Sequence, residues 1–189
     1  KVICITGGAG SIGSELCFQA IKFSPKRIIL IDNSELNVYK MQQKLNETSL
    51  SNNNVKLILG DISQPLLISE IFSKEEVDIV FHAAAYKHVP LVENNPISGI
   101  KNNSIATKII CEACIENDIK NVVLISTDKA VRPTNVMGAS KRLSELIFKS
   151  YSIKENEKLL NSKSCVCFSI VRFGNVLNSS GSVVPLFKK

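Results

Sequence analysis

Six short apolar runs, rich in β-branched residues and separated by longer amphipathic stretches, constrain the fold of this chain more than any other feature. The runs are 2–6, 27–31, 55–59, 78–83, 121–126 and 165–173. Between them apolar residues recur at spacings of three and four, as in Ile12, Leu16 and Ala20, which gives a helix one apolar face. Strands that are apolar almost throughout are covered on both faces. The pattern therefore predicts an α/β fold with a doubly wound parallel sheet.

Length and composition exclude several classes of protein. With 189 residues, 44% of them hydrophobic, the chain can bury one sizeable core. No apolar run approaches the roughly 18 to 20 residues of a membrane-spanning helix, so we expect a soluble polypeptide. The net charge of +6 comes mostly from scattered lysines, which indicates either a solvated surface or attraction of an anionic ligand. No arginine-rich or aromatic-interleaved patch points to nucleic acid.

The cysteines lie inside apolar segments, and we expect them to be buried and reduced. They are Cys4, Cys17, Cys111, Cys114, Cys165 and Cys167. Cys111 and Cys114 form a C-x-x-C, but no second pair or nearby histidine completes a zinc set, so no metal site is predicted. Reduced thiols indicate a cytoplasmic location.

The turn after the first apolar run, TGGAGSIG, carries the most informative local chemistry. It lies between a predicted strand and a predicted helix, and it satisfies G-x-G-x-x-G when read from Gly8. Glycine lets the backbone turn tightly and approach a pyrophosphate, whose charge is then held at the helix N-terminus. The turn predicts a Rossmann-like dinucleotide-binding domain. The expected contacts are Gly7, Gly10, Ser11, Ile12 and Gly13.

Asp32 follows the second apolar run, nineteen residues after the last glycine of the turn. A carboxylate there accepts a hydrogen bond from the adenosine ribose 2′-hydroxyl. It would repel a 2′-phosphate unless a cation such as Lys40 intervened, so the sequence favours NAD over NADP. The remaining expected cofactor contacts are Asp61, which would face the adenine, Ile62, Ala83 and Ala84.

Several longer segments carry a resemblance to a known family. They are TGGAGSIGSEL, DNSE, GDI, HAAAYKHVPLVENNP, STDKAVRPTNVMGASKRLSE and VRFGNVLNSSGSVVPLF. Together they resemble the extended short-chain dehydrogenase/reductases, and within these the UDP-N-acetylglucosamine 4,6-dehydratases of the polysaccharide-biosynthesis branch. The resemblance implies NAD or NADP as cofactor and a UDP-sugar as substrate. It also implies a role in capsule, O-antigen or glycan biosynthesis, and we expect a homo-oligomer.

Enzymes of this kind oxidise the sugar at C4 by hydride transfer to the cofactor, eliminate water across C5 and C6, and return the hydride to C6. The elimination needs an acid for the C6 hydroxyl and a base for the C5 proton. The resemblance implies that Asp128 is the acid and Lys129 the base, beside Thr127. For these roles we expect burial or charged neighbours to favour a protonated Asp128 and a neutral Lys129. Taken alone, the pair also fits a solvated surface ion pair.

Short-chain enzymes carry a Tyr-x-x-x-Lys pair on one helical face, in which the lysine lowers the tyrosine pKa so that the phenolate can take a proton. Here the pair is Met137 and Lys141, and a thioether is no useful acid or base. One interpretation makes Met137 a packing residue in a domain without turnover. The other is a resemblance to a membrane-anchored subgroup of the same branch, which has methionine at this position and an intact Thr-Asp-Lys set. We favour this second interpretation, because a domain without turnover would not need Asp128 and Lys129 beside Thr127. Asp128 would then also remove the C4 hydroxyl proton, while Lys141 positions the nicotinamide ribose.

Three segments are expected to hold the substrate. YKHVPLVE offers Lys87 as a cation and His88 as a donor, although His88 fits a plain loop residue equally well. Asn103 matches a position that steadies active-site water or backbone in this fold. RFGNVLNSSGS is rich in glycine and amides and suits a UDP diphosphate, with Asn175 as the best candidate. The alternative for this last segment is a purely structural turn.

These motifs predict an NAD(P)-binding domain over 1–173 and the start of a nucleotide-sugar-binding region over 174–189. Members of the branch continue past this point, so we expect most of the C-terminal substrate domain to be missing from this chain. The methionine subgroup also carries transmembrane helices before its dehydratase domain, which implies an anchored protein with this domain on the cytoplasmic face of the inner membrane. Two alternatives remain. One is a C4-epimerase, which depends on the absent tyrosine, and the other is a non-catalytic NAD(P)-binding sensor or scaffold.

Overall fold

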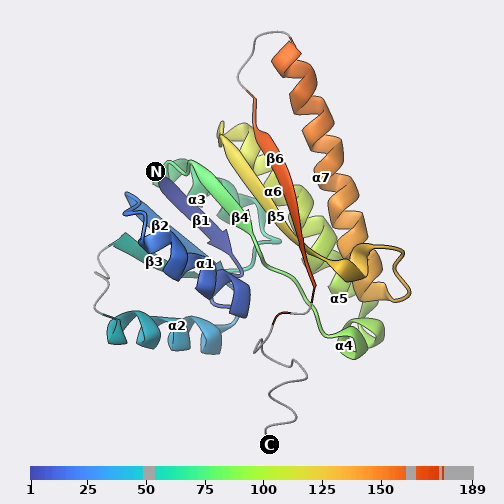
Figure 1. Ribbon diagram of the computed structural model, residues 1–189, viewed down its shortest axis with the longest axis horizontal. Helices are drawn as coiled ribbons and strands as arrows, with labels where there is room; N and C mark the ends of the chain where they lie inside the picture. Colours follow the sequence, from blue (N-terminus) through green and yellow to red (C-terminus); the bar gives the residue numbers. More distant parts are fainter. Residues whose placement is uncertain (49–53, 161–164, 175, 177–189) are drawn as a thin grey trace, which may run out of the picture.

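The computed structural model describes residues 1–48, 54–160, 165–174 and 176. One sheet contains β1 (Val2–Thr6), β2 (Arg27–Asp32), β3 (Val55–Leu59), β4 (Ile79–His82), β5 (Asn121–Thr127) and β6 (Cys167–Phe173). Its strand order is β3-β2-β1-β4-β5-β6, and every neighbouring pair is parallel (Figure 1). The predicted doubly wound parallel sheet is confirmed, and each predicted strand lies within two residues of its observed bounds.

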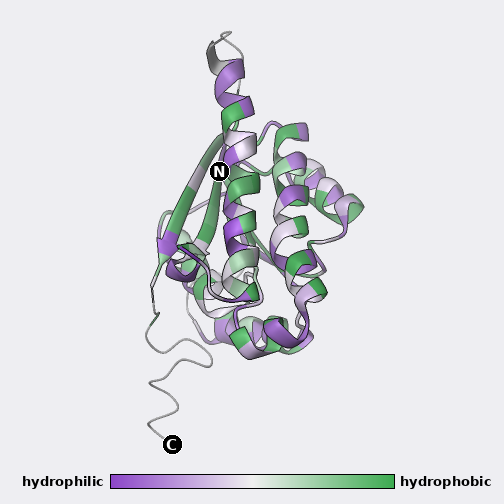
Figure 2. Ribbon diagram, turned by 90° about the vertical axis from the view of Figure 1, so that its right-hand side faces the viewer, coloured by the Kyte–Doolittle hydropathy of each residue, from purple (hydrophilic) through white to green (hydrophobic). Residues whose placement is uncertain are grey.

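Helices follow the strands in alternation. They are α1 (Ser11–Ile21), α2 (Glu35–Glu47), α3 (Pro65–Glu75), α4 (Val89–Asn94), α5 (Pro96–Ile100), α6 (Ala106–Glu116) and α7 (Val136–Leu160). A π-helical turn over Lys101–Ile105 joins α5 to α6, and a short 3₁₀ turn over Asp128–Ala130 follows β5. Figure 2 shows hydrophilic and hydrophobic residues on the same helices, as expected when one face of a helix is buried. Within the described ranges, none of the helices combines the length and apolarity needed to cross a bilayer.

The central strands are apolar throughout because both faces of the sheet are covered. In β1, Val2 and Cys4 belong to a core shared with α3, α6 and α7. The intervening Ile3 and Ile5 belong to a second core shared with α1 and α2. Successive side chains of a strand point to opposite faces, so an unbroken apolar run supplies both cores at once. The two helical layers on either side of the sheet are visible in Figure 1.

Strand β6 departs from the expectation of burial on both faces. Most of its residues are exposed, including Cys167, Ile170 and Val171. The strand lies at the edge of the sheet, where β5 and α7 are its main neighbours among the described residues. The prediction that all six cysteines are buried is therefore wrong for Cys167, and Cys165 is half-buried, whereas the other four are buried. All six thiols are free in this structure.

The parallel arrangement brings the motifs to one edge of the sheet. Every strand ends at the same side, so the turns after β1, β2, β4 and β5 lie near one another. The chain runs outward in opposite directions from β1 and β4, which are neighbours in the middle of the sheet. Open α/β sheets bind ligands outside the carboxyl ends of the strands where the strand order reverses in this way.

Candidate functional site

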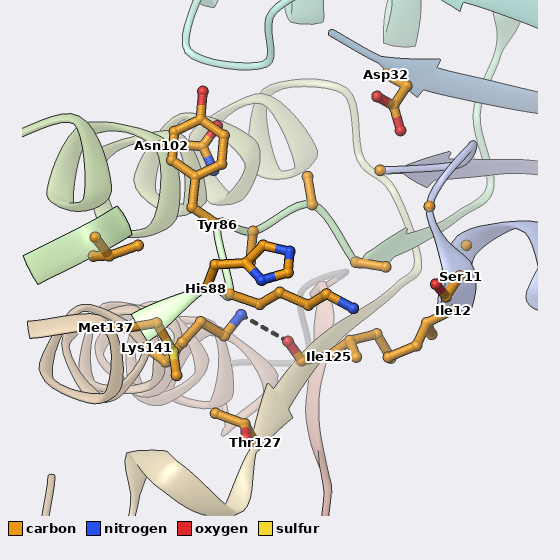
Figure 3. A pocket seen from close by; sticks show the side chains of 18 of the residues that line it. Ser11, Ile12, Asp32, Tyr86, His88, Asn102, Ile125, Thr127, Met137 and Lys141 are labelled. Carbon is orange, nitrogen blue, oxygen red and sulfur yellow. Dashed lines mark hydrogen bonds between the residues drawn. The ribbon is translucent and has the colours of Figure 1, made fainter. Parts of the chain in front are cut away.

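A cavity of about 810 Å³ opens at this edge of the sheet. Figure 3 shows Asp32 at one end, Thr127, Met137 and Lys141 at the other, and Ser11 beside the first helix. The volume is within the range of pockets that bind small molecules and cofactors. Most predicted site residues line it, namely Gly7, Gly10, Ser11, Ile12, Gly13, Asp32, Ile62, Ala83, Ala84, Lys87, His88, Thr127, Lys129 and Lys141. The fold therefore brings predicted cofactor-binding residues and predicted catalytic residues to one cavity.

The glycine turn packs its own backbone closely at the start of α1. The amide of Gly10 donates to the carbonyl of Gly7 at 3.0 Å. A Cβ on Gly13 would lie 2.1 Å from the same oxygen, so a side chain cannot be placed there without moving the turn. The helix N-terminus, with its partial positive charge, lines the cavity. This cradle fits the pyrophosphate of a dinucleotide.

Asp32 is held by two backbone amides at the end of β2. Its Oδ1 accepts from Ser34 N at 3.0 Å and its Oδ2 from Ala9 N at 3.2 Å. These bonds hold the carboxylate beside the glycine turn and leave lone pairs for ribose hydroxyls. The lysines that line the cavity come from the segments after β4 and β5 and from α7, and Lys40 is not among the lining residues that the structure describes.

At the other end of the cavity, Thr127 and the 3₁₀ turn bring three polar side chains together. Thr127 Oγ1 donates to Asp128 Oδ1 at 2.9 Å, and Lys129 Nζ donates to the same oxygen at 3.2 Å. The Asp128 side chain is 57% exposed, and these two bonds, the threonine first, lower its pKa. The expectation that burial or charged neighbours favour a protonated Asp128 is therefore not met, because the turn lies at the surface and its donors favour the ionised form. Within the described part of the chain, Asp128 stands outside the cavity lining, although both its neighbours belong to it.

Met137 and Lys141 lie one helical turn apart on α7, and both line the cavity (Figure 3). Met137 is 3% exposed and Lys141 is 5% exposed. Lys141 Nζ donates to the carbonyl of Ile125 at 2.8 Å, drawn as the dashed line in Figure 3. Burial lowers the pKa of Lys141 to about 8, and the nearby Glu145 carboxylate acts in the opposite direction. The predicted pairing of these two positions on one helical face is confirmed.

The segment after β4 is fixed by Asn103 from the π-helical turn. Asn103 is 1% exposed, accepts from Tyr86 N at 2.7 Å, and donates to Tyr86 O at 3.0 Å and to Ser140 Oγ at 2.9 Å. It thus steadies backbone, one of the two roles anticipated for it, and lies behind the lining residues. Lys87 and His88 line the cavity, and partial burial lowers the pKa of Lys87.

Asp61 is a further predicted site residue outside the described lining. Asp61 accepts from Ser63 N at 2.8 Å and so forms the turn that leads into α3. Its neighbours Gly60 and Ile62 line the cavity, whereas Asp61 does not belong to the described lining. Its contact with adenine stays a prediction. Asn175 lies outside the described residues.

The model of one protein family, described as "Polysaccharide biosynthesis protein", matches residues 3–189. The chain belongs to this polysaccharide biosynthesis protein family.

Curated relatives of this family member include proteins of capsule and nucleotide-sugar metabolism. The capsular polysaccharide biosynthesis protein CapD of Staphylococcus aureus is 45% identical over the whole chain, which covers 30% of CapD. A UDP-N-acetylglucosamine 4,6-dehydratase (inverting) of Campylobacter jejuni is 37% identical, with 100% of this chain and 53% of the relative covered. A UDP-glucose 4-epimerase of Rickettsia akari is 36% identical, with 99% and 52% covered. The chain thus spans about a third to a half of the length of these relatives.

Solved structures of similar fold cover the whole chain or nearly all of it. The structure of Pen from Bacillus thuringiensis has a TM-score of 0.90 and 33% identity, covering all of this chain and 56% of Pen. DesIV of Streptomyces venezuelae, a dTDP-glucose 4,6-dehydratase solved with NAD bound, has a TM-score of 0.79 over 99% of this chain and 61% of DesIV. At 20% identity, DesIV supports the fold alone.

Several residues that line the cavity were not predicted from the sequence. They include Tyr86, Leu91, Asn95, Ser98, Asn102 and Ser126. Tyr86, Leu91, Asn95 and Ser126 lie within the quoted motifs, so their place beside predicted residues was the available signal. Ser98 and Asn102 come from α5 and the π-helical turn. No local pattern marks such residues, because their position depends on how these short helices pack.

Proposed function

We propose that the protein containing this chain is a lyase, a nicotinamide-dependent 4,6-dehydratase that converts UDP-N-acetylglucosamine to a UDP-4-keto-6-deoxy-hexosamine for capsule, O-antigen or glycan biosynthesis. The observation that carries the proposal is that Thr127, Lys129 and Lys141 line one cavity with Asp32 and the glycine turn. Asp128 lies between Thr127 and Lys129 and accepts a hydrogen bond from each of them. The dehydratase of Campylobacter jejuni, at 37% identity, and the capsule protein of Staphylococcus aureus, at 45%, support it.

We infer that the cofactor is NAD rather than NADP. The cradle at Gly13 fits a pyrophosphate, and the Asp32 carboxylate is held beside it, where it would accept a hydrogen bond from a ribose hydroxyl. No lysine or arginine among the described lining residues lies on the β2 side of the cavity to neutralise a 2′-phosphate. When bound, nicotinamide takes the hydride from C4 of the sugar and supplies it again at C6. One N–H of the Lys141 ammonium donates to Ile125 O, and the other two can donate to the nicotinamide ribose.

The proton route follows from the ionised state of Asp128. A carboxylate with a lowered pKa begins the cycle as a proton acceptor and takes the proton of the C4 hydroxyl. Once protonated, Asp128 is the acid that delivers this proton to the departing C6 hydroxyl, which leaves as water. Asp128 is a carboxylate again after the elimination. One residue therefore serves both steps, and the thioether of Met137 is not needed as a base.

Lys129 acts at C5 in this scheme. Its ammonium is paired with Asp128 at 3.2 Å and its side chain is 42% exposed. Protonation of Asp128 removes this negative partner, and in this scheme Lys129 then gives one proton to water. The neutral amine then takes the C5 proton and returns it to C5 when C6 is reduced. At the end of the cycle Lys129 takes one proton back from water, which restores its ammonium.

Lys87 and His88 are the proposed contacts to the sugar nucleotide, from the segment that Asn103 steadies. Lys87 supplies a positive charge for an anionic ligand. The homo-oligomer, the membrane anchor, the cytoplasmic location and the diphosphate contact of Asn175 stay predictions, as does the division into two regions at residue 174.

A C4-epimerase is the second candidate, because relatives named UDP-glucose 4-epimerase are 36% identical to the chain. An epimerase oxidises and reduces C4 without elimination. It has no special use for an adjacent aspartate and lysine, and it depends on the tyrosine that Met137 replaces. We therefore rank it below the dehydratase.

Proton NMR of UDP-N-acetylglucosamine incubated with the full-length protein and catalytic NAD separates these candidates. A dehydratase gives a new C6 methyl doublet, and the doublet should form faster with NAD than with NADP. Formation of UDP-N-acetylgalactosamine without a methyl signal would establish the epimerase. If the sugar is unchanged while NAD binds in the same sample, the dehydratase proposal fails and the nucleotide-binding sensor becomes the better account.

A further inference from the structure

A buried carboxylate that the proposed reaction does not use lies one helical turn after Lys141. Glu145 is 3% exposed, and both of its oxygens accept hydrogen bonds. Oε1 accepts from Ser126 Oγ at 2.7 Å and Arg172 Nε at 2.8 Å. Oε2 accepts from Arg172 Nη2 at 2.7 Å and Arg142 Nη1 at 3.0 Å. A carboxylate has about four lone-pair sites, so Glu145 is saturated. We call these four residues the Glu145 cluster.

The Glu145 cluster adjoins the end of β5, immediately before the 3₁₀ turn over Asp128–Ala130, which we call the acid–base turn. Ser126 on β5 is paired in register with Arg172 on β6. The next pair along the ladder joins Thr127 to Phe173, after which the chain enters the Asp128–Ala130 turn. The Glu145 cluster therefore ties α7, β5 and β6 together one residue before Thr127. Any shift of Glu145 is transmitted to that turn through the backbone of β5.

Lys141 makes a second tie to the same stretch of β5. Its Nζ donates to the carbonyl of Ile125, the residue before Ser126 (Figure 3). Helix α7 thus holds two successive residues of β5, one through a lysine and one through a glutamate. Ile125, Ser126 and Thr127 all line the cavity. Lys141 and the acid–base turn are consequently positioned by the same pair of contacts between α7 and β5.

The charges around Lys141 favour a specific role for Glu145. Burial disfavours the Lys141 ammonium, and the Glu145 carboxylate is the opposing influence. His82 on β4 is buried and neutral, so it adds no positive charge. Arg142 and Arg172 neutralise part of the carboxylate through the bonds above. The charge on Lys141 therefore depends on Glu145 and, with opposite sign, on the two arginines.

We propose that Glu145 is a positioning residue that keeps Lys141 charged and holds the Thr127–Asp128–Lys129 segment in register with it. The part that concerns this segment rests on the proposed dehydratase function. The part that concerns Lys141 rests only on binding of the nicotinamide cofactor. The alternative is that Glu145 merely stabilises the fold, as a buried ion pair whose loss weakens the packing of α7.

The test compares Glu145→Gln and Arg172→Gln with a matched control, all in the full-length protein. The control is Glu155→Gln, because Glu155 is a second buried glutamate of α7, 2% exposed. It accepts from Val166 N at 3.1 Å and pairs with Lys158 at 2.5 Å, and it is absent from the described cavity lining. Thermal unfolding of each variant measures the purely structural loss.

The first readout is NADH affinity against pH, followed by cofactor fluorescence. Loss of the Lys141 proton weakens binding at high pH. Glu145→Gln should move this decline to lower pH, because the ammonium loses its negative neighbour. Arg172→Gln should move it to higher pH, because Glu145 is then less neutralised. Glu155→Gln should leave it in place. A purely structural role predicts shifts of one sign in both cluster variants, and that result would overturn the proposal.

The second readout is the rate of methyl formation. Glu145→Gln should lower kcat by about tenfold or more while KM for the sugar nucleotide changes by less than about twofold, because the change displaces catalytic groups and not the sugar contacts. Glu155→Gln should keep kcat within about twofold. Equal losses in the two variants would overturn the positioning role. Because the pH titration needs no turnover, an inactive wild-type protein counts against the dehydratase alone, and the titration still decides the role of Glu145.

Discussion

Met137 removes the usual proton acceptor from the helix that carries Lys141. Its side chain is 3% exposed and lines the cavity, so it contributes apolar packing beside the cofactor lysine. In the proposed reaction the C4 proton acceptor is Asp128, whose hydrogen bonds from Thr127 and Lys129 lower its pKa. At the scale of the residue, the proposal therefore assigns this proton transfer to the turn after β5 instead of to α7.

The exchange of roles predicts opposite results for two conservative variants. Met137→Leu conserves apolar volume and should keep kcat within about twofold. Asp128→Asn cannot accept the C4 proton and should lower kcat by at least about 100-fold. Methyl formation by NMR measures both rates, and NADH fluorescence checks that the cofactor still binds. Equal inactivity of the two variants would show that Met137 takes part in the chemistry and that the reassignment is wrong.

At the scale of the element, α7 begins very close to the acid–base turn. A Cβ on Gly138 would lie 2.4 Å from the carbonyl oxygen of Lys129 and 3.2 Å from Pro133 Cβ. Glycine at this position lets the first turn of α7 pack directly on the backbone of the proposed base. The sequence places a glycine next to Met137, but this contact depends on where the 3₁₀ turn meets the helix.

Gly138→Ala should displace the Lys129 backbone and reduce turnover. At an open helical position this change would stabilise a protein by up to about 1 kcal/mol, because alanine has the higher helix propensity. Here we expect no gain in thermal stability and a loss of kcat of about tenfold, since small displacements of catalytic groups are costly. NADH affinity should change little. Lys149→Ala, an exposed change on the same helix, is the control for helix propensity. Full turnover in Gly138→Ala would contradict the proposed tight coupling.

The strands were well predicted because burial on both faces produces a signal that needs no partner to be recognised. The runs in β1 and β3 match their observed bounds, and the others differ by one or two residues. The exception in burial is β6, whose run is equally apolar but lies at the edge of the described sheet. An apolar run indicates a strand, whereas the number of its covered faces depends on the strand order.

At the scale of the whole molecule, a chain of buried polar groups connects the sheet to α6. His82 is fully buried, with Nδ1 at 2.7 Å from Thr6 Oγ1 and Nε2 at 3.0 Å from Thr107 Oγ1. The Thr107 hydroxyl donates to Asn103 O, so it accepts from Nε2–H, and Nδ1 accepts from Thr6. Burial first, and then the positive charge of Lys141, lower the pKa of His82 to about 3. The folded protein therefore holds a neutral histidine.

This histidine makes stability depend on pH. The unfolded chain binds a proton at His82 below about pH 6.5, whereas the folded chain does so only near pH 3. The stabilisation is thus complete above pH 6.5 and is lost as pH falls. Between pH 6 and 5, before most carboxylates titrate, the free energy of unfolding should fall by up to about 1.4 kcal/mol per pH unit from this group. Urea unfolding at several pH values measures the slope.

His82→Gln should flatten this slope, because glutamine does not titrate. His88→Gln is the matched control, since His88 is the other histidine of the chain and is exposed. It should retain the slope of the wild type. An unchanged slope in His82→Gln would mean that the acid sensitivity comes from other groups.

Local sequence alone determined the strands, the alternation with helices, the glycine turn, Asp32 and the family resemblance, because each depends on residues close together in the chain. It also placed Met137 and Lys141 on one helical face. Tertiary structure decided the rest. Asp128 is exposed because of where its turn lies on the folded surface. The contacts of Glu145 with Arg172 and of Gly138 with Lys129 join residues from different elements. Their charge states and contacts depend on burial and distance, which exist only once β5, β6 and α7 have packed together.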